Sequence, residues 1–90
     1  MTRKWGRCLS NDELAIVMSW ACLADAAPSP GQLCEYVTIH DRFSAPAGRG
    51  VYGAHTCGAV LGEPLVCEGF KSDAGVYIGE PQYTFWRIAE

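Results

Sequence analysis

The chain lacks the long apolar segment that a membrane-spanning helix needs. Its 90 residues contain no uninterrupted apolar run of about 18 residues or more. The segment Met1–Arg7 is basic, but the apolar core and small-residue cleavage site of a signal peptide do not follow it. We therefore expect no membrane association and a cytoplasmic location.

The chain also lacks the short motifs that carry catalysis. It contains no nucleophile elbow, phosphate-binding loop, dinucleotide fingerprint or H-E-x-x-H zinc motif. His55 and Cys57 are two positions apart, so on a helix they would point to different faces and could not form a local dyad. The pair His40-Asp41 could orient an imidazole only toward a distant nucleophile. We expect a non-enzymatic protein without a cofactor.

The cysteines lack the close pairing that marks redox and zinc motifs. The chain has five, and no two are in C-x-x-C spacing. An odd number argues against a disulfide framework, so we expect reduced thiols that act as small apolar side chains. Zinc bound by some of Cys57, Cys67, His55 and His40 is the alternative, although structural zinc sites usually show closely spaced ligand pairs. The five cysteines are Cys8, Cys22, Cys34, Cys57 and Cys67.

Basic residues are scarce outside the N-terminus. Seven basic and ten acidic residues give the chain a net charge of −3. Arg3, Lys4 and Arg7 lie in the first seven positions, so Cys8–Glu90 has four basic against ten acidic residues, a net charge of −6. Because nonspecific DNA affinity comes largely from phosphate neutralisation by Lys and Arg, an acidic body disfavours it.

The composition that remains is typical of one globular domain. Apolar residues make up 49% of the chain and charged residues 19%, which argues against wholesale disorder. We expect residues 1–9 to form a basic N-terminal arm and residues 10–90 to form a single domain.

A capping box predicts the first helix. Ser10 and Glu13 have the S-x-x-E spacing in which each side chain bonds the other residue's backbone N–H. Apolar residues follow at helical spacing, and Pro28 closes the segment. The predicted core-facing stripe is Leu14, Val17, Met18, Ala21 and Cys22.

A second box predicts a second helix, over about Pro30 to Ile39. Ser29 would be its N-cap, Pro30 its first helical residue and Gln32 the third box position. The segment Asp41–Gly50 is rich in Gly, Pro, Ala and Ser and predicts a loop.

The third predicted helix runs from about Tyr52 to Cys67 and ends at Gly69. Its interior contains residues that weaken a helix, and we expect a kink at Pro64 because proline cannot donate to the helix ladder. The glycines either permit close packing or mark a weak element.

Three strands are expected after this helix. Glu68–Lys71, Val76–Ile78 and Tyr83–Ile88 are separated by turns at Ser72–Gly75 and Gly79–Gln82. The predicted fold is therefore α+β, with three short helices followed by a β-hairpin or a small three-stranded antiparallel wing.

This element order, and the segment Thr56–Phe70, resemble the winged helix-turn-helix family, in which a recognition helix runs into the first wing strand. The resemblance implies that the third helix binds the DNA major groove and that the wing contacts phosphate or the minor groove. The segment departs from the family pattern because it contains Glu63 and no Lys or Arg. By position, the base-facing residues would be Tyr52, His55, Thr56 and Ala59, and the phosphate contacts Arg49, Lys71 and Ser72.

Two functional hypotheses follow. In the first, the protein is a small transcriptional regulator that binds double-stranded DNA, and we expect it to form a homodimer. The phosphate contacts would then include Arg3, Lys4, Arg7, Arg42 and Arg49. In the second, a winged-helix-like acidic surface binds a host protein complex, as in small phage-encoded inhibitors such as anti-CRISPR proteins.

Overall fold

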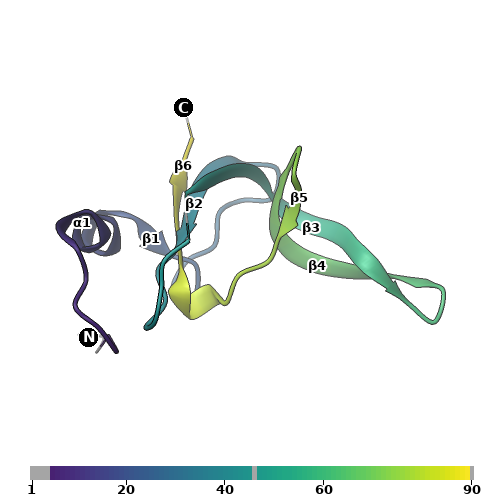
Figure 1. Ribbon diagram of the computed structural model, residues 1–90. Helices are drawn as coiled ribbons and strands as arrows, with labels where there is room; N and C mark the ends of the chain where they lie inside the picture. Colours follow the sequence, from purple (N-terminus) through teal and green to yellow (C-terminus); the bar gives the residue numbers. More distant parts are fainter. Residues whose placement is uncertain (1–4, 46, 90) are drawn as a thin grey trace.

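The chain forms one α-helix and an extensive antiparallel sheet (Figure 1). The structure is a computed structural model that describes residues 5–45 and 47–89. In chain order the elements are α1 (Asn11–Ser19), β1 (Ala21–Cys22), β2 (Leu33–Thr38), β3 (Gly48–Val60), β4 (Glu63–Ser72), β5 (Gly75–Tyr77), the short 3-10 helix η1 (Pro81–Tyr83) and β6 (Thr84–Ile88).

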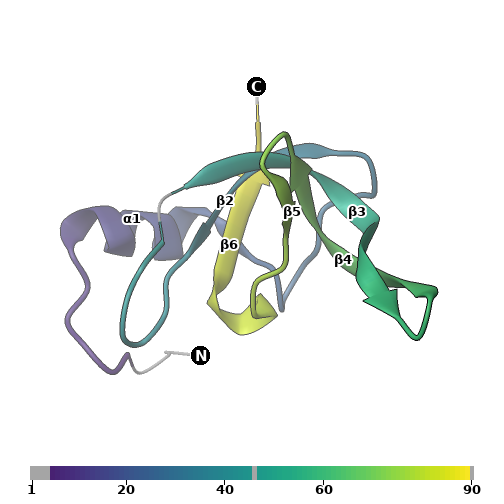
Figure 2. The same ribbon diagram turned by 45° about the vertical axis from the view of Figure 1, so that its right-hand side comes forward.

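The six strands belong to one sheet with the order β1-β6-β2-β3-β4-β5. Each neighbouring pair is antiparallel. Figures 1 and 2 show α1 at one end of the molecule and the β3–β4 hairpin extending from the other. The molecule measures 43 × 30 × 24 Å, so it is elongated along this direction.

The predicted capping box of the first helix is confirmed. The Ser10 hydroxyl accepts from the Glu13 N–H at 3.2 Å, and the Glu13 carboxylate accepts from the Ser10 N–H at 2.9 Å. The helix is shorter than expected, because the chain becomes extended at Trp20 and the next two residues pair with Phe85 and Trp86 of β6. Pairing with the sheet has overridden local helix propensity at this point.

The expected core-facing stripe of this helix is largely wrong. No residue of α1 is fully buried, and Met18 is 85% exposed. Ile16 and Val17 are the helix residues that pack against the buried cluster of Val37, Ile39 and Phe85.

The predicted second helix is wrong. The segment Ser29–Gln32 is a β-turn closed by a bond from the Gln32 N–H to the Ser29 carbonyl at 3.1 Å. Gly31 has φ +89°, and proline followed by a glycine with positive φ is the signature of a type II turn. The same four residues therefore satisfy both a helix start and a turn, and β2 follows immediately.

The predicted third helix is also wrong, and with it the winged-helix fold. The segment from Tyr52 to Cys67 forms most of the β3–β4 hairpin. Helix-weakening glycines are tolerated in this ribbon, where Gly62 forms part of the turn. The predicted strands Val76–Ile78 and Tyr83–Ile88 are confirmed within one residue as β5 and β6. The predicted strand Glu68–Lys71 is the C-terminal part of β4, which begins five residues earlier.

The core lies on both faces of β2. Tyr36 stacks against Phe70 at a ring separation of 4.6 Å and against Tyr77 at 4.8 Å, with Cys34 and Tyr52 beside them. Side chains alternate along a strand, so the neighbouring residues of β2 face the other cluster, beneath α1. Burial on both faces makes β2 the centre of the fold.

Among the described residues, no helix is both long and apolar enough to span a membrane.

Candidate functional site

The β3–β4 hairpin extends beyond the rest of the sheet (Figure 2). β2 pairs with β3 only from Gly48 to Val51, and β5 pairs with β4 only from Phe70 to Ser72. Residues 53–69, here called the projecting hairpin, therefore pair only with each other in the described sheet. Such a ribbon has little support from a core, so its own turn and cross-links must hold it.

The turn of the projecting hairpin contains two residues, Leu61 and Gly62. Val60 pairs with Glu63, and both turn residues have positive φ, +52° and +81°. Two positive φ values in succession are the pattern of a type I′ turn, whose twist suits a tight hairpin. Leucine is uncommon in this conformation, since its Cβ crowds the following carbonyl. An apolar side chain is thus held at the end of the hairpin despite a conformational cost.

A disulfide joins the two strands of the projecting hairpin. Cys57 and Cys67 are bonded, with their Cα atoms 6.1 Å apart. The strand register shifts between Thr56 and Gly58, which makes Cys57 the extra residue of a β-bulge. Our expectation of five reduced thiols is therefore wrong for these two cysteines, and the zinc alternative loses two of its proposed ligands.

The other three cysteines are free. Cys8 is exposed, Cys22 is half-buried and Cys34 is buried in the core. Burial raises the pKa of the Cys34 thiol, which keeps it protonated and unreactive. Among the described residues, no cluster of three or more His, Cys, Asp and Glu side chains could hold a metal ion.

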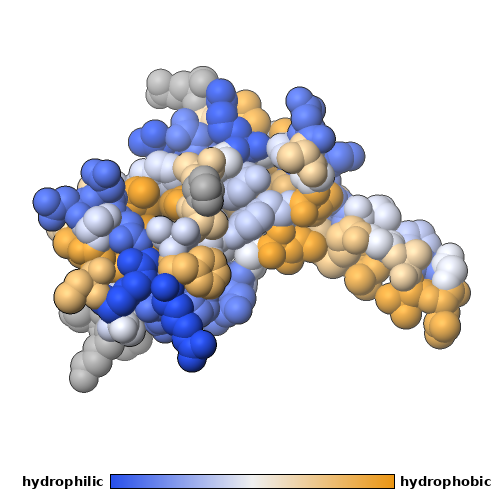
Figure 3. All heavy atoms as spheres, viewed as in Figure 1, coloured by the Kyte–Doolittle hydropathy of each residue, from blue (hydrophilic) through white to orange (hydrophobic). Residues whose placement is uncertain are grey.

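The end of the projecting hairpin is apolar and exposed. Leu61 is 100% exposed, Val66 60% and Val60 56%, and Figure 3 shows orange, apolar residues at this end of the molecule as well as elsewhere on the visible face. We call these residues, with Leu65, the apolar tip. Exposed apolar side chains that form a contiguous patch mark interaction surfaces in soluble proteins, whereas single exposed apolar residues do not.

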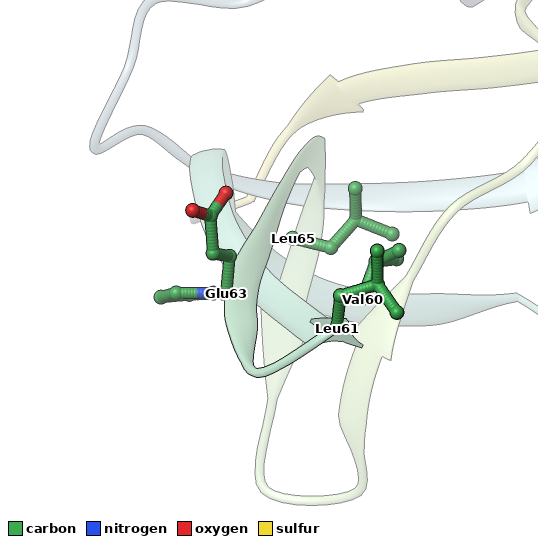
Figure 4. A pocket seen from close by; sticks show the side chains of 5 residues that line it. Val60, Leu61, Glu63 and Leu65 are labelled. Carbon is green, nitrogen blue, oxygen red and sulfur yellow. The ribbon is translucent and has the colours of Figure 1, made fainter.

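A shallow hollow of about 320 Å³ lies beside the turn. Figure 4 shows Val60, Leu61 and Leu65 gathered on one side of the hairpin and the Glu63 carboxylate directed to the other. The tip therefore presents an apolar surface with one acidic group at its margin. The residues that line the hollow are Val60, Leu61, Glu63, Pro64 and Leu65.

The projecting hairpin is acidic and contains no Lys or Arg. Its two charged residues are Glu63 at the tip and Glu68 near the base. The Tyr52 hydroxyl donates to the Glu68 carboxylate at 3.3 Å. Burial first, and then the Glu68 charge, raise the pKa of Tyr52, so the phenol stays protonated and remains a donor. This bond ties the base of the hairpin to the aromatic core.

A second hollow, of about 330 Å³, lies between the loop after β2 and the segment before η1. His40 packs between Phe43, at a ring separation of 5.1 Å, and Tyr83, at 4.2 Å. The Tyr83 hydroxyl donates to Asp41 at 2.9 Å, and the Thr38 hydroxyl oxygen has no hydrogen-bond partner among the described residues.

The residues expected to face DNA bases are not on a helix. Tyr52 is 8% exposed and belongs to the core, so it cannot contact a base. The His55 ring shares a hydrogen bond with the Val51 carbonyl at 3.0 Å. Thr56 and Ala59 are exposed on β3. These four residues lie along strand β3, so they do not form the recognition helix in the major groove that the resemblance implied.

The expected phosphate contacts are dispersed. Arg7 binds the Glu13 carboxylate at 2.5 Å and donates to the His40 carbonyl at 3.2 Å. Arg42 is exposed in the loop after β2. Arg49 lies in β3, two positions from the residue opposite Lys71, so these two basic residues are diagonal neighbours.

The remaining expected phosphate contacts add little to that pair. Ser72 pairs with Gly75 at the β4–β5 turn, and its hydroxyl accepts from the Ala74 N–H at 3.2 Å. Arg3 and Lys4 lie outside the described residues. The structure thus brings together Arg49 and Lys71 but leaves Arg7 and Arg42 elsewhere.

The apolar tip was not expected from the sequence. The signal for it is a two-residue Leu-Gly break between two runs that each contain Val, which lacks the Asn-Gly or Asp-Gly pattern of most type I′ hairpins. Comparisons of the chain with protein-family models, curated proteins and solved structures gave no match. The site therefore has to be interpreted from its own geometry.

Proposed function

We propose that the protein is a protein-binding module whose projecting hairpin inserts its apolar tip into an apolar site on a partner protein. The observation that carries this proposal is the exposure of Val60, Leu61, Leu65 and Val66 at the end of a disulfide-linked hairpin. Leaving these side chains in water is unfavourable by about 25 cal/mol for each Å² of apolar surface. A complex that buries them recovers that free energy.

The disulfide should increase the affinity of such a tip for a partner. The disulfide restricts the hairpin before binding, so less conformational entropy is lost when the tip becomes fixed in a complex. Binding energy at interfaces is concentrated in a few well-packed central side chains. Leu61, fully exposed at the turn, is placed to act as that central residue.

The charge of the hairpin indicates the chemistry of the partner. Glu63 borders the apolar tip and Glu68 lies near the base, without a basic residue between them. A partner site with an apolar floor and Lys or Arg at its rim would complement this pattern. Inhibition of a host protein complex, the second of our two functional hypotheses, is one outcome of such a contact.

Double-stranded DNA binding remains a prediction from the sequence. The winged helix that motivated it is absent, and the tip contains no basic residue, whereas phosphate contacts depend on Lys and Arg. Arg49 and Lys71 are the residues that would support it. A salt series of duplex DNA binding, with Arg49→Ala as the variant, measures their contribution.

The disulfide bears on the compartment. We expected a cytoplasmic protein, but cytosolic thiols are kept reduced, so the Cys57–Cys67 bond favours an oxidising compartment. The test is to isolate the protein from its natural source under non-reducing conditions, alkylate its free thiols and measure its mass. The mass distinguishes a reducing compartment from an oxidising one. Five alkylated cysteines would indicate a reducing compartment and three an oxidising one.

Site-specific photo-crosslinking tests the proposal in cells that naturally produce the protein. A photoreactive amino acid replaces Leu61 at the tip or, as the matched control, Asp73 in the exposed β4–β5 turn. We expect one discrete protein adduct from position 61 that position 73 does not form. Adducts of equal pattern from both positions, or none from position 61, would contradict the proposal.

A further inference from the structure

The outer edge of β3 is open along the projecting hairpin. Tyr52 exchanges hydrogen bonds on this side, since its N–H donates to the Gln32 carbonyl at 3.0 Å and its carbonyl accepts from the Gly31 N–H at 2.8 Å. Backbone groups alternate in direction along a strand, so those of Ala54 and Thr56 point the same way as those of Tyr52. No described strand lies beside them there.

This edge lacks the charged residues and prolines that commonly prevent strands from associating. From Gly50 to Val60, β3 contains no charged residue and no proline. Natural edge strands usually carry Lys, Pro or a covering segment that blocks further pairing. β4 has such protection, since it contains Pro64 and Glu68 and is covered by β5 at its end. The β-bulge at Cys57 twists the β3 edge but does not cover it.

We infer that two copies of the chain pair through the β3 edges of their projecting hairpins, antiparallel and related by a two-fold axis. The occupant is a second copy because an uncharged strand meets no like charge when it pairs with itself. Pairing through β4 would instead place four acidic residues, Glu63 and Glu68 of each copy, along the shared edge. Two-fold self-complementary contacts are also the commonest form of protein dimer.

The pairing joins two hairpins into one four-stranded sheet. Unpaired N–H and C=O groups of Ala54 and Thr56 gain partners from the other copy. Both faces of the sheet and the turn at Leu61 remain accessible, so the dimer would present two apolar tips. This inference therefore goes beyond the proposed function and does not depend on the identity of a protein partner.

The test is sedimentation velocity over a concentration series, in a Cys8→Ser background. That background removes the exposed free thiol, which could otherwise link two copies covalently. The decisive variant is Ala54→Lys. Ala54 lies opposite Glu68, so the new lysine can pair within its own hairpin while it places two positive charges at the dimer seam. The matched control is Val66→Lys, which adds the same charge on β4, opposite Thr56.

We expect the background protein to dimerise, Ala54→Lys to weaken the dimer by roughly tenfold or more, and Val66→Lys to leave it within about threefold. A monomer at every concentration would overturn the inference. A dimer that survives Ala54→Lys, or one that Val66→Lys disrupts equally, would also overturn it, because the contact would then lie elsewhere. Circular dichroism of each variant confirms that it is folded.

The two proposals fail separately. A dimer with this mutational pattern but no adduct from a photoreactive residue at position 61 retains the strand pairing and rejects the protein-binding tip. A monomer that forms the adduct does the reverse.

Discussion

Cys57 and Cys67 join the two strands of the projecting hairpin by a disulfide, ten residues apart in sequence, at the point where β3 contains an extra residue. The bond lies between the aromatic base of the hairpin and its apolar tip. Residues 53–69 pair only with each other in the described sheet, and this bond adds a covalent restraint to their strand pairing. Several properties of the protein should depend on it.

Replacement of both bonded cysteines by serine should loosen the hairpin locally. The loop-entropy relation gives about 2.7 kcal/mol for a closed loop of this length, which is an upper limit here because only the hairpin opens. Amide hydrogen exchange should accelerate in residues 54–66 and stay unchanged in β2 and β6. Cys8→Ser is the control and should change neither. Equal acceleration across the sheet would contradict a local role.

The variant Leu61→Asn should stabilise the protein by about 0.5–1 kcal/mol. Leu61 has φ +52°, a conformation that asparagine adopts at less cost than leucine. The substituted side chain is fully exposed, so no packing is lost. Urea unfolding monitored by tryptophan fluorescence measures the change. A loss of stability would show that the apolar side chain supports the hairpin.

Two glycines of the hairpin should differ in their tolerance of alanine. A Cβ at Gly69 would clash with the Tyr77 carbonyl oxygen and lie 3.2 Å from the Ile78 side chain, whereas at Gly58 nothing lies within 4 Å. Gly69→Ala should therefore cost about 1–3 kcal/mol through displacement of β5. Gly58→Ala should stay within about 0.5 kcal/mol of the native protein. Thermal unfolding compares the two, and equal effects would refute the register of β4 with β5.

Glu13 should make stability depend on acidity. The Arg7 guanidinium, followed by the Ser10 backbone N–H, lowers the pKa of Glu13 from 4.5 to about 2. The unfolded chain therefore binds this proton more readily, so the stabilisation is complete above pH 4.5 and is lost as the pH falls toward 2.

The variant Glu13→Gln isolates this charge, because glutamine can also complete a capping box. The difference in unfolding free energy between native protein and variant should be constant at neutral pH and should shrink below pH 4.5. A difference that persists unchanged at pH 2 would show that the charge is not the cause.

Local signals in the sequence predicted parts of the fold correctly. The Ser10–Glu13 capping box operates within four consecutive residues, so it forms whatever surrounds it. The turn at Ser72–Gly75 and the strands on either side also depend on neighbouring residues. These elements could be recognised without knowledge of the tertiary structure.

Ambiguous or distant signals misled the prediction. Ser29-Pro30-Gly31-Gln32 fits a helix start, but positive φ at Gly31 turns the chain instead. β3 pairs with β4 through a turn that lacks the usual Asn or Asp, so its residues were interpreted at helical spacing. The apolar tip was consequently assigned to a helix interior. The secondary structure of these segments depends on the strands with which they pair, and the local periodicity of the sequence does not reveal those partners.

The affinity of the photo-crosslinked partner for the native protein and for Leu61→Asn tests the central claim most directly. This variant keeps the hairpin intact and removes only the apolar side chain at its tip. Isothermal titration calorimetry should show a dissociation constant at least about tenfold higher for Leu61→Asn, and no change for the control Asp73→Asn. Equal affinities of the native protein and Leu61→Asn would contradict the conclusion that the tip binds the partner.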